Sequence, residues 1–395
     1  MVTLLNVPVT PQPPQPPHPH LPTWPPTVRK AGAPLAAIIG LSVVVGLLMI
    51  LLTATNPVGT AIGFVLSSIA ITVVLLCYLW LDRWEPEPPR LLILAFLWGA
   101  SVAIILSLVL ELWADAVFLP TPGLPDGFES TALRAPLIEE AAKGLFLLLM
   151  MTGHRRHELN SLTDCLVYAG LVGAGFAWFE DILYIANGET LGSSLAIAAL
   201  RLVMAPFAHS LFVSMLAVGV YFALKQRHLV GKLACIVAGY LAAVAMHALW
   251  NGSSVIGIEA YFLVYLVWMM PMFGLAIWLA VRSRRREQQV VAAKLPTMVA
   301  ADLITPNEAS WLGSIQHRKL AIGEASRHAG KAAGKSVKAF ATQVVELAFV
   351  RDRIDRGFGD DRVQALLVEE SYRVHAARQA AAPTLQYLAG YRIPG

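Results

Sequence analysis

Ionisable side chains recur inside long apolar stretches of this sequence, where a membrane interior would make them costly. Such groups cost about 2.5–3.5 kcal/mol each on insertion scales, so they usually mark a functional interior. They come from four stretches, residues 134–152, 162–186, 195–224 and 232–251. The side chains concerned are Glu139, Glu140, Lys143, Glu180, His209 and His247. Carboxylates and imidazoles activate water or bind a hydrolytic metal, and we expect this set to do that chemistry.

We expect these ionisable residues to lie at a similar depth in the membrane. Helical rise places the two adjacent glutamates about one and a half turns from the outer end of their stretch. Glu180 lies a similar distance from the outer end of its own stretch, and His247 lies about one turn from its end. His209 reaches the same level if its helix begins near Leu200 rather than at Leu195. We therefore expect one layer of functional groups in the outer half of the membrane.

A metal-dependent hydrolysis is the first chemistry that fits. Glu180, His209 and His247 would form a set of two histidines and one carboxylate, with a fourth position left for water. This ligand pattern suits a hydrolytic Zn²⁺. Glu139 or Glu140 would then be the general base. The sequence contains no H-E-x-x-H, so the ligands must come from separate spans.

A metal-free hydrolysis fits the same residues. Here Glu139 or Glu140 activates water directly. The two histidines and Asn251 then stabilise the tetrahedral oxyanion. Both mechanisms hydrolyse an amide in a water-containing cavity of the membrane, and the residues leave the choice between them open.

Helical spacing adds supporting residues. Side chains four positions apart share a helix face. The pairs are Glu139 with Lys143, Glu180 with Tyr184, and His247 with Asn251. Gly173 and Gly175 remove side chains where their helix approaches a neighbour or a substrate. Pro206 predicts a kink just before His209.

The elements that position these residues are membrane spans. Hydrophobic residues make up 56% of the 395, and charged residues only 14%, against about 25% in a soluble domain. This excludes an ordinary cytosolic enzyme and a disordered chain. Eight stretches approach the ~20 residues that cross a bilayer, and we predict an all-α, polytopic membrane bundle of about eight helices. They are residues 36–55, 58–81, 91–112, 134–152, 162–186, 195–224, 232–251 and 259–281.

Charge in the connections predicts the orientation. Lys and Arg precede the first stretch, follow every second one and cluster after residue 281, whereas the alternate connections contain none. Positive loops face the cytoplasm. We therefore expect a multi-pass protein of the cell membrane with both termini in the cytoplasm.

Three regions follow from composition. Residues 1–34 hold eleven of the 25 prolines and predict a disordered or polyproline II tail. Residues 35–282 form the eight-span domain. Residues 283–395 predict a small, basic, helical cytoplasmic appendage, since 18 Lys and Arg face 11 Asp and Glu from residue 282 onward. That charge favours anionic lipid headgroups, and a solvated helical tail explains it equally well.

At these residues the sequence resembles the PrsW-type intramembrane proteases, which are distantly related to the CAAX-processing glutamate endopeptidases. The matching segments are Asp82-Arg83-Trp84-Glu85-Pro86-Glu87-Pro88, Glu139-Glu140-Ala141-Ala142-Lys143, Gly175-Phe176-Ala177-Trp178-Phe179-Glu180 with Tyr184, His209 with Phe212, and His247-Ala248-Leu249-Trp250-Asn251. They occur in family order over about residues 36–281. The family commonly has Asn where this sequence has Asp181, which leaves the role of Asp181 open.

The resemblance implies a membrane endopeptidase that cleaves a single-span membrane protein, such as an anti-sigma factor, near the outer face. It also implies that Glu139 and Glu140 are catalytic and that Glu180, His209 and His247 complete the site. The family's metalloprotease label agrees with a zinc ion, although ligand spacing alone does not establish one. The lipid bilayer is the other expected partner, and no nucleic acid is expected.

Two other classes fit parts of the pattern. A proton- or ion-coupled transporter would use the same buried Glu and His residues as a relay. The two four-span halves, however, show no repeated pattern of the kind that many transporters display. A non-catalytic scaffold acting through the two tails would leave the buried charges unexplained.

Overall fold

The computed structural model describes residues 33–84, 86–118, 127–359 and 361–390. The Pro-rich tail expected over residues 1–34 therefore lies outside the described residues except for its last two, and so does Glu85. Every regular element in the described ranges is a helix, as the all-α prediction requires.

Seven helical segments have the length and apolar composition to cross a membrane. Four of these segments are single helices: α1 (Leu35–Thr55), α2 (Pro57–Leu81), α6 (Leu162–Ala186) and α9 (Leu229–Ile256). The other three segments each consist of two α-helices with a π-helical segment between them. The first comprises α3 (Pro89–Leu97), η1 (Trp98–Ala103) and α4 (Ile104–Val117), and the second comprises α7 (Leu191–Ala198), η4 (Ala199–Met204) and α8 (Ala208–Leu224). The third comprises α10 (Ile258–Val264), η5 (Tyr265–Met269) and α11 (Met270–Ala300).

The remaining predicted span, residues 134–152, is shorter than the others. It forms α5 (Ala135–Met150), which has 16 residues and carries three charged side chains. The π-helical segment η2 (Glu129–Arg134) precedes it directly. About 20 residues are needed to cross the hydrocarbon core. The eighth membrane crossing therefore stays a prediction, and it requires η2 and α5 to span the membrane as one continuous segment.

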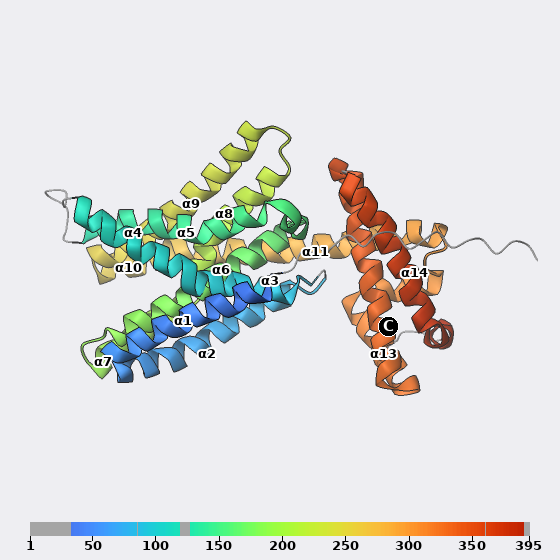
Figure 1. Ribbon diagram of the computed structural model, residues 1–395, viewed down its shortest axis with the longest axis horizontal. Coiled ribbons are helices and arrows are strands. Elements are labelled where there is room, and N and C mark those ends of the chain that lie inside the picture. Colours follow the sequence, from blue (N-terminus) through green and yellow to red (C-terminus); the bar gives the residue numbers. More distant parts are fainter. Residues whose placement is uncertain (1–32, 85, 119–126, 360, 391–395) are drawn as a thin grey trace, which may run out of the picture.

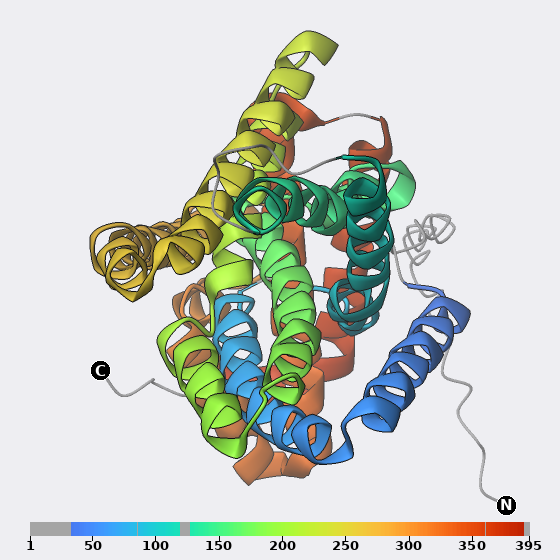
Figure 2. The same cartoon turned by 90° about the vertical axis from the view of Figure 1, so that its left-hand side faces the viewer.

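Helix α6 is the centre of the membrane bundle. Its most apolar window is 89% buried within the protein, against 6% for α1. It packs against α2, α3, η1 and α8, while α1 lies at one edge of the bundle and α10 at the other (Figure 2). Glycines permit these close approaches, because a Cβ on Gly173 would lie 2.6 Å from Cα of Ser210, and one on Gly175 would overlap the carbonyl oxygen of Phe96.

The predicted break before His209 is confirmed. The π-helical segment η4 ends at Met204 and α8 begins at Ala208, with Pro206 between them. Proline has no N–H to continue the helical ladder and clashes with the preceding turn. Because α8 starts anew, His209 stands in its first turn.

The C-terminal helices form a core of their own. They are α12 (Pro306–Leu312), α13 (Ile315–Arg353), η6 (Ile354–Phe358) and α14 (Asp361–Ala389), and they lie at the far end of α11, away from α7 and α10 (Figure 1). Trp84, from the connection between α2 and α3, packs into this core beside residues of α11, α13 and α14. Helix α11 runs unbroken past the boundary predicted at 282/283, so the division into two domains stays a prediction.

Candidate active site

The six side chains singled out in the sequence meet in one place. Helix α5 contributes three of them, and α6, α8 and α9 contribute one each: Glu139, Glu140 and Lys143, then Glu180, His209 and His247. Glu140, Lys143 and His247 are exposed by no more than 1%. Four helices thus bring charged groups into an interior where each of them needs a partner.

Lys143 lies at the centre of this cluster. Its ammonium donates to Oε2 of Glu139 at 3.0 Å and to Oε1 of Glu140 at 2.8 Å. It also lies 3.1 Å from Nδ1 of His209 and 3.9 Å from the centre of the Phe176 ring. Lys143 follows the two glutamates by four and three residues, so one cation compensates both carboxylates on the same helix.

Each imidazole lies between a carboxylate and the centre of the cluster. Nε2 of His209 is 2.7 Å from Oε2 of Glu180, while its Nδ1 faces Lys143. Nδ1 of His247 is 2.9 Å from Oε1 of Glu140, while its Nε2 is 3.9 Å from Oε2 of Glu139. A carboxylate on one ring nitrogen fixes the tautomer and orientation of the other nitrogen.

Arg201 in η4 also belongs to the site, although the sequence pattern did not single it out. Its Nε lies 2.5 Å from Oδ1 of Asp181, its Nη2 pairs with Oε2 of Glu180, and its guanidinium lies 4.3 Å from the centre of the Tyr184 ring. The sequence does distinguish Arg201, because it is the one Asp, Glu, Lys or Arg residue within the apolar stretch 195–224. Asp181, the departure from the family pattern, is therefore the second carboxylate of an ion-pair network.

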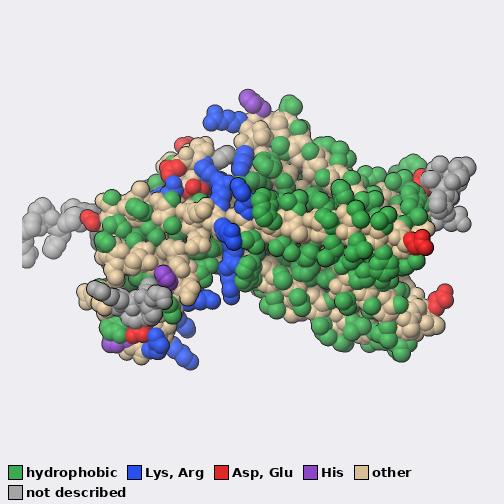
Figure 3. Space-filling model, turned by 180° about the vertical axis from the view of Figure 1, so that it is seen from behind, with side chains coloured by type: hydrophobic (Ala, Val, Ile, Leu, Met, Phe, Trp, Pro, Cys, Tyr) green, Lys and Arg blue, Asp and Glu red, His purple; other side chains and the backbone are tan. Residues whose placement is uncertain are grey.

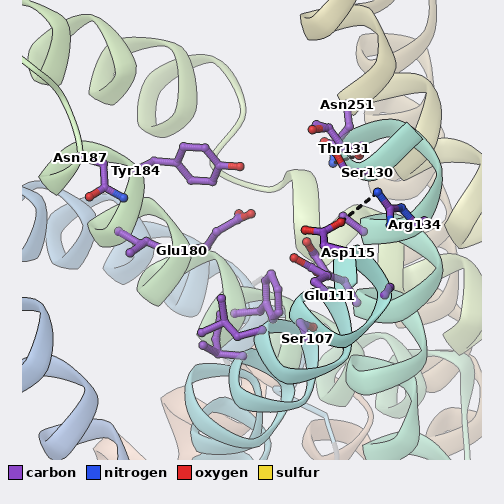
Figure 4. Close-up of a pocket in the computed structure, with 17 residues that line it drawn as sticks. Ser107, Glu111, Asp115, Ser130, Thr131, Arg134, Glu180, Tyr184, Asn187 and Asn251 are labelled. Atoms are coloured by element: carbon purple, nitrogen blue, oxygen red, sulfur yellow. Dashed lines mark hydrogen bonds and ion pairs between the residues drawn. The ribbon is translucent and has the colours of Figure 1, made fainter. Parts of the chain in front are cut away.

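A cavity of about 410 Å³ reaches this cluster. Glu139 and Glu180 line it, whereas Glu140 and Lys143 are not part of its wall. Figure 4 shows Glu180 and Tyr184 on one side of the cavity and Glu111, Asp115 and Arg134 on the other. The other polar lining residues are Ser107, Ser130, Thr131, Asn187 and Asn251.

Two residues of this cavity differ from what the sequence suggested. Asn251 donates its amide to the carbonyl of Thr131 at 3.1 Å, on the α5 side of the cavity, instead of joining the histidines. Glu111 in α4 was not singled out, although it is an acidic residue near the end of the third stretch. Its Oε1 is buried and has no hydrogen-bond partner among the described residues.

The comparisons with known proteins agree with this geometry. Residues 87–276 match the model of the PrsW family, described as intramembrane metalloproteases. That range contains every residue of the buried cluster and of the cavity. Residues 87–276 belong to the PrsW family.

Two curated relatives align with the PrsW domain. The chain is 27% identical to Protease PrsW of Geobacillus kaustophilus over 147 residues, which are 37% of this chain and 60% of that protein. It is 27% identical to Protease PrsW of Oceanobacillus iheyensis over 191 residues, which are 47% of this chain and 80% of that protein. No solved structure matches the chain. Helices α1 and α2, most of α11 and helices α12–α14 lie outside the family match.

The PrsW domain offers one set of candidate metal ligands in the described part of the chain. Donor atoms of Glu139, His209 and His247 lie within 4.8 Å of one another. This set differs from the one expected from the sequence, in which Glu180 was the carboxylate, because Arg201 engages Glu180 and holds it on the opposite side of His209. Two histidines and a carboxylate are a donor set that fits a catalytic zinc ion with an open position.

Proposed function

We propose that this protein is a membrane endopeptidase that hydrolyses a peptide bond of a membrane-protein substrate with water activated by Glu139. One observation carries the proposal: Glu139 belongs both to the wall of the cavity and to the buried cluster of Lys143 and the two histidines. A substrate carbonyl and a water molecule in the cavity would therefore meet a carboxylate whose orientation is already fixed. Such a pre-oriented carboxylate is the requirement for general-base catalysis.

The neighbouring residues then have distinct roles. Glu140 lies behind Glu139, outside the cavity wall, and orients His247 through its 2.9 Å contact. Lys143 balances the two adjacent carboxylates, so that they coexist in a buried site. Glu180 orients His209 and is itself held by Arg201. In this arrangement Glu139 exchanges protons with water. The two imidazoles do not line the cavity and hold the charged cluster beside Glu139.

A metal ion would be held by Glu139, His209 and His247. When bound, zinc supplies Lewis-acid polarisation and lowers the pKa of water. The Lys143 ammonium lies within hydrogen-bond distance of Glu139 and His209, so Lys143 and a metal ion compete for the same two side chains. This assignment is tested by comparing the metal content of the purified protein with that of a His209→Ala/His247→Ala variant. Equal metal content in the two proteins would show that these histidines do not bind a metal ion.

We further propose a single-span membrane protein as the substrate, with an anti-sigma factor as the example that the family suggests. The charge pattern of the connections supports cleavage near the outer face and cytoplasmic termini, since Lys and Arg gather on alternate connections. Helices α4 and α6 and the segment η2 line most of the cavity. A substrate helix has to unwind beside these helices before its backbone reaches Glu139.

Cleavage of a single-span reporter protein in proteoliposomes tests the proposed activity. Glu139→Gln removes the base while keeping the size of the side chain, and we expect it to lower the rate by about 10²–10⁴-fold. Glu259→Gln in α10 is the matched control, because Glu259 is exposed and lies outside the cluster and the cavity. Full cleavage by Glu139→Gln, or Glu139-dependent ion flux without any cleavage, would contradict the proposal.

A further inference from the structure

A second cavity lies where the membrane bundle meets the C-terminal helices. It has a volume of about 750 Å³ and is lined from the end of α8, the start of α6, the middle of α11 and the end of α13 with η6. It belongs to a different part of the molecule from the candidate active site, and the two cavities share no lining residue. A ligand bound in this second cavity would therefore lie outside the candidate active site.

Positive charge dominates this second cavity. Five cationic side chains line it against two acidic ones, and the cations are Lys225, Arg282, Arg285, Arg286 and Arg356. The two acids are already engaged, since Asp352 pairs with Arg356 at 2.7 Å and Glu287 accepts a hydrogen bond from Ser161 at 3.3 Å.

The other four cations have no carboxylate within ion-pair distance among the described residues. Lys225 and Arg286 instead approach the hydroxyl of Tyr221, at 2.5 and 3.5 Å. Arg282 lies 5.4 Å from the ring of Trp278. Several uncompensated cations around one hollow attract an anion, and guanidinium groups in particular suit phosphate.

The same cavity has an apolar side that faces outward. Phe222 and Trp278 line it and remain 49% and 54% exposed. Ile277 and Leu275 continue the exposed apolar surface along α11, away from the C-terminal helices. Tryptophan concentrates at the membrane–water interface. Figure 3 shows a band of Lys and Arg between the hydrophobic surface of the bundle and the C-terminal part.

We propose that this cavity binds the headgroup of an anionic phospholipid. The phosphate would lie among Lys225, Arg285 and Arg286, and the acyl chains would cover Phe222 and Trp278. Basic pockets between membrane helices at the cytoplasmic boundary are suited to such headgroups. A free phosphate would meet the same cations but would leave the apolar wall uncovered, which is why the lipid is the favoured ligand. The inference does not depend on the proposed protease activity.

The bound lipid would join two parts of the chain. Its phosphate would contact α8 and α11 of the bundle, and Arg356 of η6 lines the same cavity. Anionic lipid would thereby hold the C-terminal helices against the membrane body. This gives the basic C-terminal region a ligand at a defined place, where the sequence indicated only a general attraction to anionic membranes.

Titration of the full-length protein in neutral detergent with phosphatidylglycerol tests this site, with binding read by native mass spectrometry and by the thermal midpoint. We expect Arg285→Gln/Arg286→Gln to weaken binding about tenfold or more, since each basic residue near an anionic lipid contributes substantially. Arg227→Gln/Lys232→Gln removes one cation from the α8–α9 connection and one from the first turn of α9, both outside the cavity, and should leave binding unchanged. Arg285→Lys/Arg286→Lys keeps the charge and should retain most of the binding, which separates a lost site from a misfolded protein.

Two ligand controls complete the test. Phosphatidylcholine, which carries no net charge, should stabilise the protein far less than phosphatidylglycerol. Inorganic phosphate should bind much more weakly than the lipid, because it cannot cover Phe222 and Trp278. Equal binding of phosphatidylcholine, equal binding of inorganic phosphate, or undiminished lipid binding by Arg285→Gln/Arg286→Gln would each overturn the proposal.

Discussion

Charge compensation decides how the buried residues of the site are arranged. Lys143 balances two carboxylates, and Arg201 balances two more. The sequence was sufficient to find the residues of the cluster, because an ionisable side chain in an apolar stretch is conspicuous. It was not sufficient to find Glu139, rather than Glu180, as the carboxylate of the candidate metal-ligand set. That choice depends on which nitrogen of each imidazole faces which helix, and only the fold determines this.

Loss of Arg201 should strongly destabilise the protein. Arg201→Gln would leave Glu180 and Asp181 buried with too little positive charge, and breaking a buried ion pair costs about 3–5 kcal/mol. We expect a large drop in the free energy of unfolding, measured in detergent. Asp181→Asn in the same chain should restore part of it, since one of the two carboxylates is then neutral. Additive effects of the two substitutions would show that the residues are not coupled.

Asp82, in the connection between α2 and α3, gives the protein a predicted pH dependence. Burial, with the nearby Asp164 as a further cause, raises the pKa of Asp82 to about 7. At pH values between the ordinary pKa of an aspartate and about 7, Asp82 is therefore protonated in the native state and ionised in the unfolded state. Stability contributed by Asp82 must fall as the pH rises through this window.

The expected result is a difference between variants. Asp82→Asn cannot ionise, so its thermal midpoint should fall less than that of the unaltered protein between about pH 5 and about pH 8. Asp302→Asn, at an exposed position, is the control and should behave as the unaltered protein does. Identical pH profiles for Asp82→Asn and the unaltered protein would show that the buried carboxyl is not responsible.

At the scale of the helices, α6 organises the membrane part. Its glycines let α8 and the α3–η1 segment approach closely enough to bring His209 and Glu180 together. Spacing in the sequence predicted these close contacts and the break at Pro206. It did not predict the π-helical segments η1, η2, η4 and η5. The expectation of eight spans also did not anticipate the shortness of α5, because apolar runs mark where a helix can form and not where its hydrogen-bond pattern changes.

Gly175 provides the test at this scale. Gly175→Ala places a methyl group against the backbone of Phe96 and Ala100, and overpacking of this kind costs about 1–3 kcal/mol. Gly274→Ala in α11 is the matched control, because nothing lies within 4 Å of a Cβ there. We expect Gly175→Ala to lower the thermal midpoint and the peptidase activity together. Gly274→Ala should leave the midpoint unchanged or raise it slightly.

At the scale of the whole molecule, Trp84 joins the bundle to the C-terminal helices. It is 4% exposed, packs in their core, and has the guanidinium of Arg318 4.5 Å from its ring. Glu87 extends the link inward, since it accepts a hydrogen bond from Tyr168 of α6 at 2.7 Å. Composition separated a hydrophobic part from a basic part of the chain, but a contact between residues so far apart in sequence cannot be inferred from composition.

Trp84→Ala should loosen the C-terminal helices selectively. Removing a buried tryptophan costs about 3–5 kcal/mol, and we expect faster hydrogen exchange in α13 and α14 with little change in α6. Trp113→Ala is the control, because Trp113 is 58% exposed and lies outside that core. Unchanged exchange in α13 and α14 would mean that Trp84 does not hold the two parts together.

The most direct test of hydrolysis by Glu139-activated water is cleavage of a single-span substrate in water labelled with heavy oxygen, with the fragments analysed by mass spectrometry. Hydrolysis adds one oxygen from water to the new carboxyl terminus. We expect one labelled oxygen in the fragment that carries the new carboxyl terminus and none in the other fragment. We also expect a cut within or next to the transmembrane segment, and loss of both fragments with Glu139→Gln but not with Glu259→Gln. An unlabelled new carboxyl terminus, or cleavage at an undiminished rate with Glu139→Gln, would contradict this mechanism.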